Sequence, residues 1–116
     1  MCIRDRVWIE EYFVFKAEED EKIVGNIYGK FAAGVLYIDD LIIAKDQRGR
    51  GIGKILIGKA EEWGKGLGTH KVYLITKKEK NSVARKFYGK LGYKETGEFK
   101  KHYHHFDFII YEKVFF

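Results

Sequence analysis

The chain has 116 residues, of which 46% are hydrophobic and 16% aromatic, so its composition suits one folded domain and excludes an intrinsically disordered protein. The formal net charge of +5 is compatible with an anionic ligand, but the lysines are interspersed with acidic residues, as on an ordinary solvated surface. No apolar run approaches the length of a membrane span, and a lone cysteine, Cys2, excludes an internal disulfide. We therefore expect one cytoplasmic domain over residues 1–116, in which residues 1–6 form a tail or are an artefact.

Three strands are predicted before a glycine-rich loop. Aromatic and β-branched residues favour the first two. A near-continuous apolar run, interrupted by Asp39 and Asp40, indicates that the third is buried on both faces. Small residues at 29–34 predict a loop or bulge between the second strand and the third. The predicted strands are residues 12–16, 22–28 and 35–44.

Helices and strands alternate in the second half of the chain. Apolar residues spaced three and four apart predict two helices, the first with Ile55 and the second with Val83 on its apolar face. Asn81 or Ser82 is expected to cap the second helix. The order is thus β-β-β-α-β-α-β-β, an α+β fold with a mixed sheet and helices on its faces. The predicted elements are a helix at 51–65, a strand at 71–76, a helix from 81 to 91, and strands at 93–99 and 106–114.

The loop between the third strand and the first helix has the character of an anion site. It reads Gln47-Arg48-Gly49-Arg50-Gly51-Ile52-Gly53-Lys54, with glycines that let the backbone approach a ligand and basic side chains around a helix N-terminus. These features are best suited to phosphate, although a tight turn without any ligand would use the same glycines. A Walker A loop is excluded because Ile55 follows Lys54 where that motif needs Ser or Thr, and the glycine spacing also fails the Rossmann pattern.

Two motifs together resemble those of the GNAT acetyltransferases. The segment Arg48-x-x-Gly51-x-Gly53 resembles the pyrophosphate-binding motif of that family. Further along the chain, Asn81-x-x-Ala84-x-x-x-Tyr88-x-x-x-Gly92-Tyr93 also resembles the family, and the predicted strand at 71–76 lies between the two motifs, as it should. The resemblance covers residues 12–114, and two motifs in the right order are more specific than either alone.

The resemblance implies an N-acetyltransferase that transfers the acetyl group of acetyl-CoA to a primary amine of a small molecule or protein, by direct attack through a tetrahedral intermediate. It implies that Asn81 contacts the pantetheine or phosphate arm and that Tyr88, a phenol that is neutral at pH 7, protonates the leaving thiolate. A core role for Tyr88 and a simple helix cap for Asn81 remain open. The strand before the loop is implied to splay from its neighbour and to offer its backbone to the pantetheine and the acetyl carbonyl. The implied cofactor-binding residues are Leu41, Ile42, Ile43, Arg48, Gly49, Arg50, Gly51, Ile52, Gly53, Lys54 and Asn81.

The acids within the third strand are candidates for activating the acceptor amine. The stretch from Leu36 to Leu41 resembles that of diamine and polyamine acetyltransferases, which have Glu at the position of Asp39. The resemblance implies that Asp39 binds or deprotonates the acceptor, through water where the shorter side chain does not reach it. Neighbouring strand residues point to opposite faces, so at most one of Asp39 and Asp40 is expected to face the active site, and both acids could instead be structural.

Three histidines, His102, His104 and His105, lie between the last two predicted strands. Histidine clusters can bind zinc, but His104 and His105 are adjacent, and no carboxylate or cysteine has ligand spacing with them, so we expect no metal. The resemblance implies that this hairpin borders the acceptor site, and an exposed loop without a function is the alternative.

The stretch before residue 12 is too short for the strand and two helices with which members of the family usually begin. We therefore expect an N-terminally shortened member, in which a partner subunit could cover the gap, so a homodimer is one open alternative. Two other functions remain open, a non-catalytic module that binds acetyl-CoA and a basic nucleic-acid-binding domain, although no RNP-type sequence or basic helix stands out. We expect neither nucleic acid nor a membrane as partner.

Overall fold

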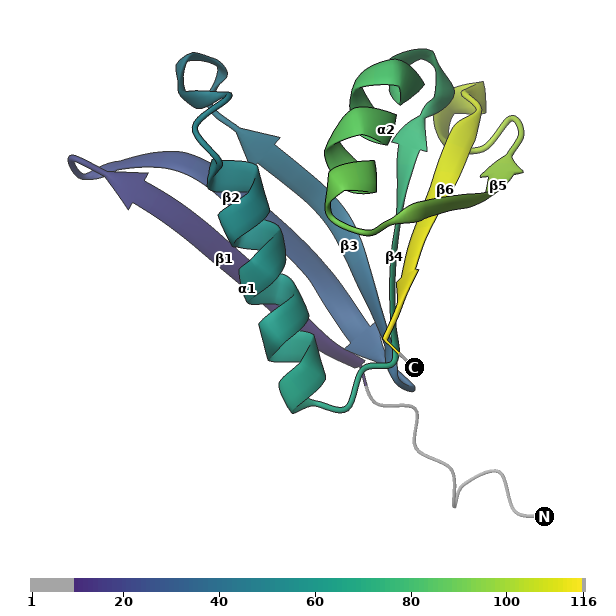
Figure 1. The fold of residues 1–116 in the computed structure, drawn as a ribbon, viewed down its shortest axis with the longest axis horizontal. Coiled ribbons are helices and arrows are strands. Elements are labelled where there is room, and N and C mark those ends of the chain that lie inside the picture. The colour runs from purple at the N-terminus through teal and green to yellow at the C-terminus, as the bar shows by residue number, and fades with distance from the viewer. Residues whose placement is uncertain (1–9, 116) are drawn as a thin grey trace.

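The chain forms one six-stranded sheet with two α-helices (Figure 1). A computed structural model describes residues 10–115, so the predicted tail at residues 1–6 lies outside the described range. The strand order across the sheet is β1-β2-β3-β4-β6-β5, and all neighbours are antiparallel except β3 and β4, which confirms the predicted mixed sheet and order of elements. The elements are β1 (Glu10–Glu19), β2 (Lys22–Ala32), β3 (Val35–Ile43), α1 (Ile52–Gly66), β4 (Lys71–Lys77), α2 (Asn81–Lys90), β5 (Lys94–Phe99) and β6 (Phe108–Val114).

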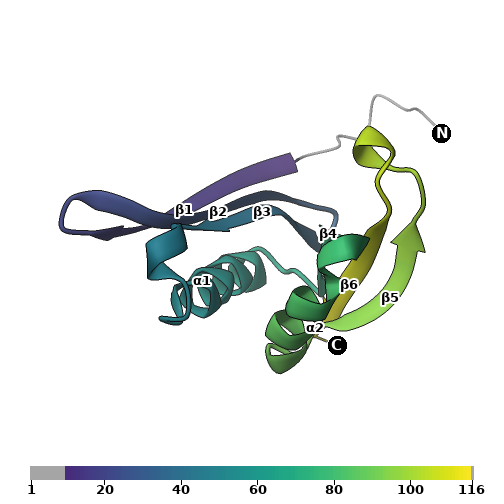
Figure 2. The same ribbon diagram turned by 90° about the horizontal axis from the view of Figure 1, so that it is seen from above.

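Both helices pack on the same face of the strongly twisted sheet, rather than on its two faces as predicted (Figure 2). α1 lies over β1, β2 and β3, whereas α2 lies over β4 and β5, so each helix covers one half of the sheet. Within residues 10–115, neither helix is long and apolar enough to cross a membrane. The centre of the core between the helices and the sheet consists of Ile27, Leu36, Ile57, Ala60, Val72, Leu74 and Tyr111.

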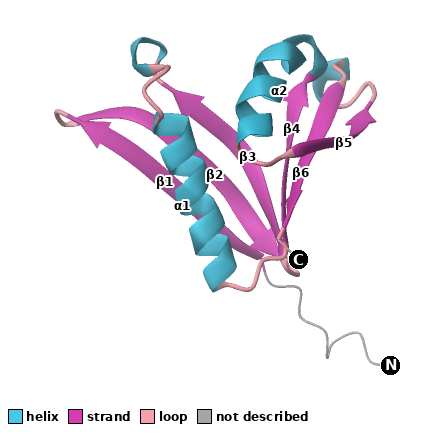
Figure 3. Cartoon of the chain, in the orientation of Figure 1, coloured by secondary structure: helices cyan, strands magenta, loops and turns pink. Residues whose placement is uncertain are grey.

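The parallel strands β3 and β4 separate soon after they meet. They pair only between residues 35–37 and 71–73, and beyond this point β3 stays with β2 while β4 stays with β6. Figure 3 shows the two strands diverging, and we call residues 38–43 of β3 and 74–77 of β4 the splayed region. The free edge of β3 there presents backbone N–H and C=O groups that no neighbouring strand uses. The predicted splay of this strand is therefore present.

A β-bulge shapes β3 at the start of the splayed region. The register between β2 and β3 shifts between Tyr28 and Gly29 and leaves Asp39 as the extra residue. Gly29 is required because a Cβ atom at this position would lie 1.9 Å from the carbonyl oxygen of Tyr37. The loop or bulge predicted at residues 29–34 is therefore largely wrong: β2 continues to residue 32, only a short turn precedes β3, and the extra residue of the bulge lies on β3.

Because helices cover only one face of the sheet, the prediction that β3 is buried on both faces is wrong. Leu36 and Ile38 are buried on the helix face, whereas Asp40 and Ile42 are exposed on the opposite face. The bulge at Asp39 shifts the alternation by one residue, so that Leu41 and Ile43, rather than Asp40 and Ile42, pack toward the core.

Some predicted helix positions also differ. Ile55 and Val83 were expected on the apolar faces of the helices, but their side chains are 62% and 73% exposed, and Ile57 takes the buried position in α1. Neither Asn81 nor Ser82 caps α2, because Lys80 occupies the N-cap position and makes no side-chain cap bond. The side-chain oxygen of Asn81 instead accepts a hydrogen bond from the hydroxyl group of a tyrosine on β6.

Candidate active site

The free edge of β3 can be assigned residue by residue. The Ala44 N–H donates to the Val24 carbonyl at 2.8 Å, so Ile42, two residues earlier, also turns its backbone groups toward β2. Leu41 and Ile43 consequently point their N–H and C=O groups into the splayed region. Two of the three expected backbone positions therefore face a site between the strands, whereas Ile42 has its backbone in the β2 ladder and its side chain on the exposed face.

The glycine-rich loop forms an open cradle between β3 and α1. Gly49 and Gly51 have φ angles of 83° and 80°, and a Cβ atom at either position would meet nothing within 4 Å. These left-handed conformations favour glycine, and the empty surroundings leave room for a ligand. The first N–H groups of α1, those of Ile52, Gly53 and Lys54, make no hydrogen bond to any described residue, because the first helical bond runs from Ile55 to Gly51. They remain free to bind an anion.

The basic side chains around the cradle differ in their availability. Arg50 is held by an ion pair with Glu19 at 2.9 Å and by a hydrogen bond to Gln47. Arg48 and Lys54 are exposed, and neither has a hydrogen bond or ion pair within residues 10–115. Two cations are therefore available beside the free N–H groups, and the third is anchored to the tip of the β1–β2 hairpin.

Gly53 brings the cradle close to the second helix. A Cβ atom at this buried position would lie 3.0 Å from the Phe87 ring of α2 and 3.6 Å from the Leu41 side chain. Gly53 therefore lacks a side chain so that α1 and α2 can pack closely, whereas Gly49 and Gly51 allow the backbone its left-handed φ angles. This contact connects the phosphate cradle with the wall that carries Tyr88.

Tyr88 lies on the α2 side of the splayed region, and its ring faces the sheet as predicted. The ring centroid is 5.5 Å from that of Tyr111 on β6 and 5.8 Å from that of Tyr93. Burial raises the pKa of Tyr88 to about 12, and the nearby Asp40 carboxylate and Tyr111 phenol add to the rise. The Tyr88 hydroxyl makes no hydrogen bond to a described side chain or backbone group, so it is available to a ligand.

Asn81 belongs to a hydrogen-bond network beneath Tyr88. Its side-chain oxygen accepts the Tyr111 hydroxyl, which also lies 3.2 Å from Glu95. Arg85 completes the network by donating three hydrogen bonds to Glu95. The pKa of Glu95 is lowered, first by a hydrogen bond from Asn81 and further by those from Arg85 and Tyr111. Asn81 thus fixes the β6 tyrosine on which Tyr88 rests.

Asp39 and Asp40 both lie at the entrance to the splayed region and are exposed. Asp40 accepts the N–H of Leu41 at 2.9 Å, which turns its carboxylate toward the free edge of β3. Asp40, rather than Asp39, is the acid whose charge raises the pKa of Tyr88. The sequence alone points to Asp39 rather than Asp40, because the bulge that sets the position of Asp40 becomes visible only in the strand pairing.

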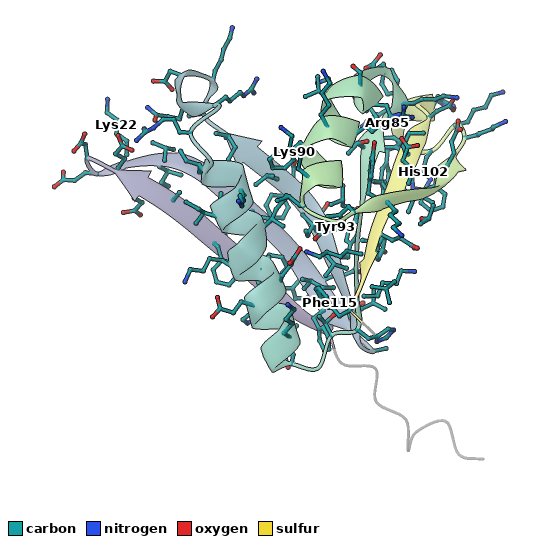
Figure 4. The ribbon with its side chains drawn as sticks, in the orientation of Figure 1. Lys22, Arg85, Lys90, Tyr93, His102 and Phe115 are labelled. Atoms are coloured by element: carbon teal, nitrogen blue, oxygen red, sulfur yellow. The ribbon has the colours of Figure 1, made fainter. Side chains whose placement is uncertain are left out.

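A buried ion pair links the two halves of the molecule and was also missed. The Glu61 carboxylate of α1 accepts the Tyr93 hydroxyl at 2.7 Å and Lys113 Nζ at 3.1 Å. Tyr93, labelled in Figure 4, lies between the base of α2 and α1, and its pKa is raised by burial and by Glu61. The signal in the sequence that could have predicted this ion pair was an acidic residue directly after Ala60 on the apolar face of α1. We call Glu61, Tyr93 and Lys113 the interhelix clamp.

The histidines lie on the hairpin between β5 and β6. His102 stacks on Phe99 with ring centroids 4.7 Å apart, and His104 and His105 are exposed in left-handed conformations. No group of three metal-ligating side chains occurs within residues 10–115. The pKa of Tyr37 on β3 is raised by burial, then by Asp39 and by the neighbouring Tyr103 of this hairpin, and the position of the hairpin beside the acceptor site stays a prediction.

Comparison with known proteins identifies the fold. The profile of the Acetyltransferase (GNAT) family matches residues 3–93. An uncharacterized N-acetyltransferase of Methanocaldococcus jannaschii is 30% identical over 89 residues, which are 77% of this chain and 57% of that relative. The chain thus spans little more than half the length of this curated relative.

Solved structures agree in fold over nearly the whole chain. A Bacillus anthracis protein assigned as a streptothricin acetyltransferase, solved with acetyl coenzyme A, is 25% identical with a TM-score of 0.82, and the match covers 99% of this chain and 69% of that one. PaiA N-acetyltransferase from Thermoplasma acidophilum, solved with coenzyme A, is 26% identical with a TM-score of 0.74, over 89% and 60% of the two chains. With a family profile that matches most of its length and the splayed sheet beside a glycine cradle, the chain belongs to the GNAT acetyltransferase family.

Proposed function

We propose that the protein is an N-acetyltransferase that transfers the acetyl group of acetyl-CoA to a primary amine of a small molecule or protein. The observation that carries the proposal is the alignment of an anion cradle, a free strand edge and an unbonded phenol around one splayed region. The solved relatives with acetyl coenzyme A and coenzyme A support the same ligand for this chain.

The cradle fits the diphosphate of acetyl-CoA. The free N–H groups of Ile52, Gly53 and Lys54 can each donate to a phosphate oxygen, and the positive end of α1 favours its charge. The Arg48 and Lys54 side chains supply countercharge. A larger residue at Gly49 or Gly51 would both strain the backbone and fill the space left for the ligand. Arg50 would act more indirectly, through its pair with Glu19.

The free edge of β3 fits the pantetheine arm. Leu41 and Ile43 offer backbone donors and acceptors there, as an amide-containing chain requires. The Leu41 N–H is held by Asp40 in the free protein, so its use by a ligand would need the Asp40 carboxylate to turn away. That movement would release the carboxylate for the acceptor. Asn81 would contribute mainly by holding Tyr111 beneath Tyr88.

Acetyl-CoA supplies a thioester carbonyl that an amine attacks, giving a tetrahedral intermediate from which the thiolate leaves. With a pKa of about 12, Tyr88 stays protonated at neutral pH and can donate its hydroxyl proton toward the departing sulfur. Asp39 accepts the proton that the attacking amine must lose, directly or through water, and its exposure allows exchange with solvent. The alternative in which both acids are structural predicts no effect of Asp39→Asn on the pH profile.

The test is a thiol-release assay with acetyl-CoA and a panel of amines, run beside calorimetry of acetyl-CoA alone. We expect Tyr88→Phe to lower kcat about a hundredfold or more while acetyl-CoA still binds. The control is Tyr12→Phe, a similar change at an exposed position on the sheet face without helices. Binding without turnover for every amine would favour the non-catalytic module, and absence of binding would refute the proposed function. Salt-sensitive binding to DNA or RNA would instead support the nucleic-acid alternative.

A further inference from the structure

One hydroxyl group in the splayed region takes no part in the hydrogen bonding of the fold. The Oγ1 atom of Thr76, on β4, is buried and makes no hydrogen bond to any residue from 10 to 115. Burial of a hydroxyl without a partner is unfavourable, and proteins seldom keep such a group. Among the buried side-chain oxygens and nitrogens of the same residues, only the Asn26 amide oxygen is also unpaired, and it lies on β2, which β3 separates from β4. The unpaired hydroxyl of Thr76 therefore calls for an explanation.

The Thr76 side chain lies on the face of the sheet that the helices cover. β4 pairs with β6 without a register shift, so the side chains of β4 alternate between the two faces. Leu74 is buried on the helix face, and Thr76 follows it two residues later. On β6, Ile109 is directly opposite Thr76, and Tyr111 is its diagonal neighbour on the same face. Because the Tyr88 ring packs against Tyr111 with centroids 5.5 Å apart, Thr76 and Tyr88 lie on the same face of the sheet beside the splayed region.

Valine at this position would give a more stable free protein. It has the shape of threonine with a methyl group in place of the hydroxyl, it is equally favoured in strands, and it would leave no polar atom unpaired. The neighbours of Thr76 on this face of β4 and β6, Leu74 and Ile109, are apolar and have no side-chain acceptor. A threonine in a strand also lacks the bond to the preceding turn that its hydroxyl can make in a helix. The hydroxyl thus destabilises the free protein, which indicates a role with a ligand rather than in the fold.

Thr76 is placed to reach a ligand between β3 and β4. The two strands pair only as far as Tyr37 and Tyr73, so no described strand covers the β3 side of β4 at Thr76. The residue as a whole is only half-buried, although its Oγ1 atom is fully buried. Rotation about χ1 is enough to move the hydroxyl from its buried position toward the gap between the strands. A hydroxyl both donates and accepts hydrogen bonds, so it can bond either the N–H or the C=O of an amide.

We propose that the Thr76 hydroxyl binds the pantetheine arm of acetyl-CoA where this arm lies between β3 and β4. The inference rests on the proposed function, which puts the arm along the free edge of β3. The backbone of Leu41 and Ile43 can bond only the amide groups that face β3, so an amide group that faces β4 needs another partner. Thr76 supplies this partner from the opposite strand. Binding of acetyl-CoA then pairs a hydroxyl that is unpaired in the free protein, and this gain adds to the affinity.

The test removes the hydroxyl and then restores it, with binding measured by calorimetry. Thr76→Val should weaken acetyl-CoA binding about three- to tenfold, the effect of one hydrogen bond. Thr76→Ser keeps the hydroxyl and should bind acetyl-CoA within about twofold of the unchanged protein. ADP carries a diphosphate but no pantetheine arm, so its affinity, measured by competition with acetyl-CoA, should be the same in Thr76→Val as in the unchanged protein. The control is Thr96→Val, the same chemical change at an exposed position of β5, which should alter neither affinity.

Urea unfolding without ligand gives a second, independent measurement. Thr76→Val should unfold at a higher urea concentration than the unchanged protein, because it no longer buries an unpaired hydroxyl. A threonine with a purely structural role would give the opposite result, since its hydroxyl would stabilise the free protein. The inference therefore predicts that one substitution raises stability and lowers acetyl-CoA affinity.

The outcomes separate this inference from the proposed function. Unchanged acetyl-CoA affinity in Thr76→Val, or an equal loss in Thr76→Ser, would overturn the inference and leave the acetyltransferase intact. An equal loss of affinity for ADP and acetyl-CoA would show a general disturbance of the site and would also reject it. A lower urea midpoint for Thr76→Val would mean that the hydroxyl has a partner in the free protein, which contradicts the premise. Absence of acetyl-CoA binding by the unchanged protein would instead defeat the proposed function, and the inference with it.

Discussion

Replacing Glu61 by Gln tests whether the interhelix clamp holds the two halves of the molecule together. The carboxylate accepts bonds of 2.7 Å from Tyr93 and 3.1 Å from Lys113, and its side chain is only 11% exposed. A hydrogen bond to a charged group contributes about 1.5–3 kcal/mol, and Gln retains part of the bond to Tyr93. Lys113 would lose its countercharge but is 27% exposed, so water screens part of that loss. We expect the free energy of unfolding to fall by about 2–3 kcal/mol.

The assay is urea unfolding at neutral pH, with the slope of the transition compared between variants. Glu62→Gln is the matched control, since it makes the same chemical change on the exposed side of α1, and it should change stability by less than about 0.5 kcal/mol. Tyr93→Phe should cost about 1–2 kcal/mol by removing one bond to the carboxylate. The reasoning would be refuted if Glu61→Gln were no more destabilising than Glu62→Gln.

Two further predictions concern the backbone and alkaline pH. Gly29→Ala should prevent stable folding, because its Cβ would lie 1.9 Å from the Tyr37 carbonyl oxygen, whereas Gly58→Ala, in open space on α1, should stabilise the protein by about 0.5–1 kcal/mol; thermal melts compare the two, and a stable Gly29→Ala protein would disprove the bulge. Tyr88 and Tyr111 both have a pKa of about 12, above the unfolded value near 10, so the stabilisation from keeping them neutral is complete below pH 10 and is lost as the pH rises to 12. Denaturant midpoints measured across this range should fall, with a smaller fall in Tyr88→Phe, and equal falls in both proteins would contradict the burial of this phenol.

The parts of the site that the sequence predicted are those whose chemistry is local. The loop from Arg48 to Gly53 carries its own evidence, because positive φ angles and a helix N-terminus depend on adjacent residues. The splay and the position of Tyr88 came from the resemblance of two motifs to a known family. In each case the pattern needed no knowledge of which strands pair.

What could not be predicted depends on contacts between distant segments. The direction of the Asp40 side chain depends on the β-bulge in β3. This bulge can form because Gly29 on β2 has no Cβ atom and so lets the Tyr37 backbone come close to β2. Asn81 has the residue type of a helix cap, but Tyr111, thirty positions later, competes successfully for its side chain. Ile55 fits a helical apolar stripe, yet its side chain is exposed, and Ile57 takes the buried position in α1 instead. Local sequence propensity predicts one position or role for such residues, but tertiary contacts determine another.

The position of the splayed region explains why the clamp matters for chemistry as well as for stability. The cradle and the free edge of β3 belong to the half covered by α1, whereas Tyr88 and the network of Asn81 belong to the half covered by α2. The halves meet at the short β3–β4 pairing, at Gly53 against Phe87, and through Glu61. A ligand held by the half that α1 covers would therefore face Tyr88, the proposed general acid, on the half that α2 covers. If transfer proceeds as proposed, loosening Glu61 should lower kcat more than acetyl-CoA affinity, because the cradle stays whole while the distance to the Tyr88 hydroxyl becomes less well defined.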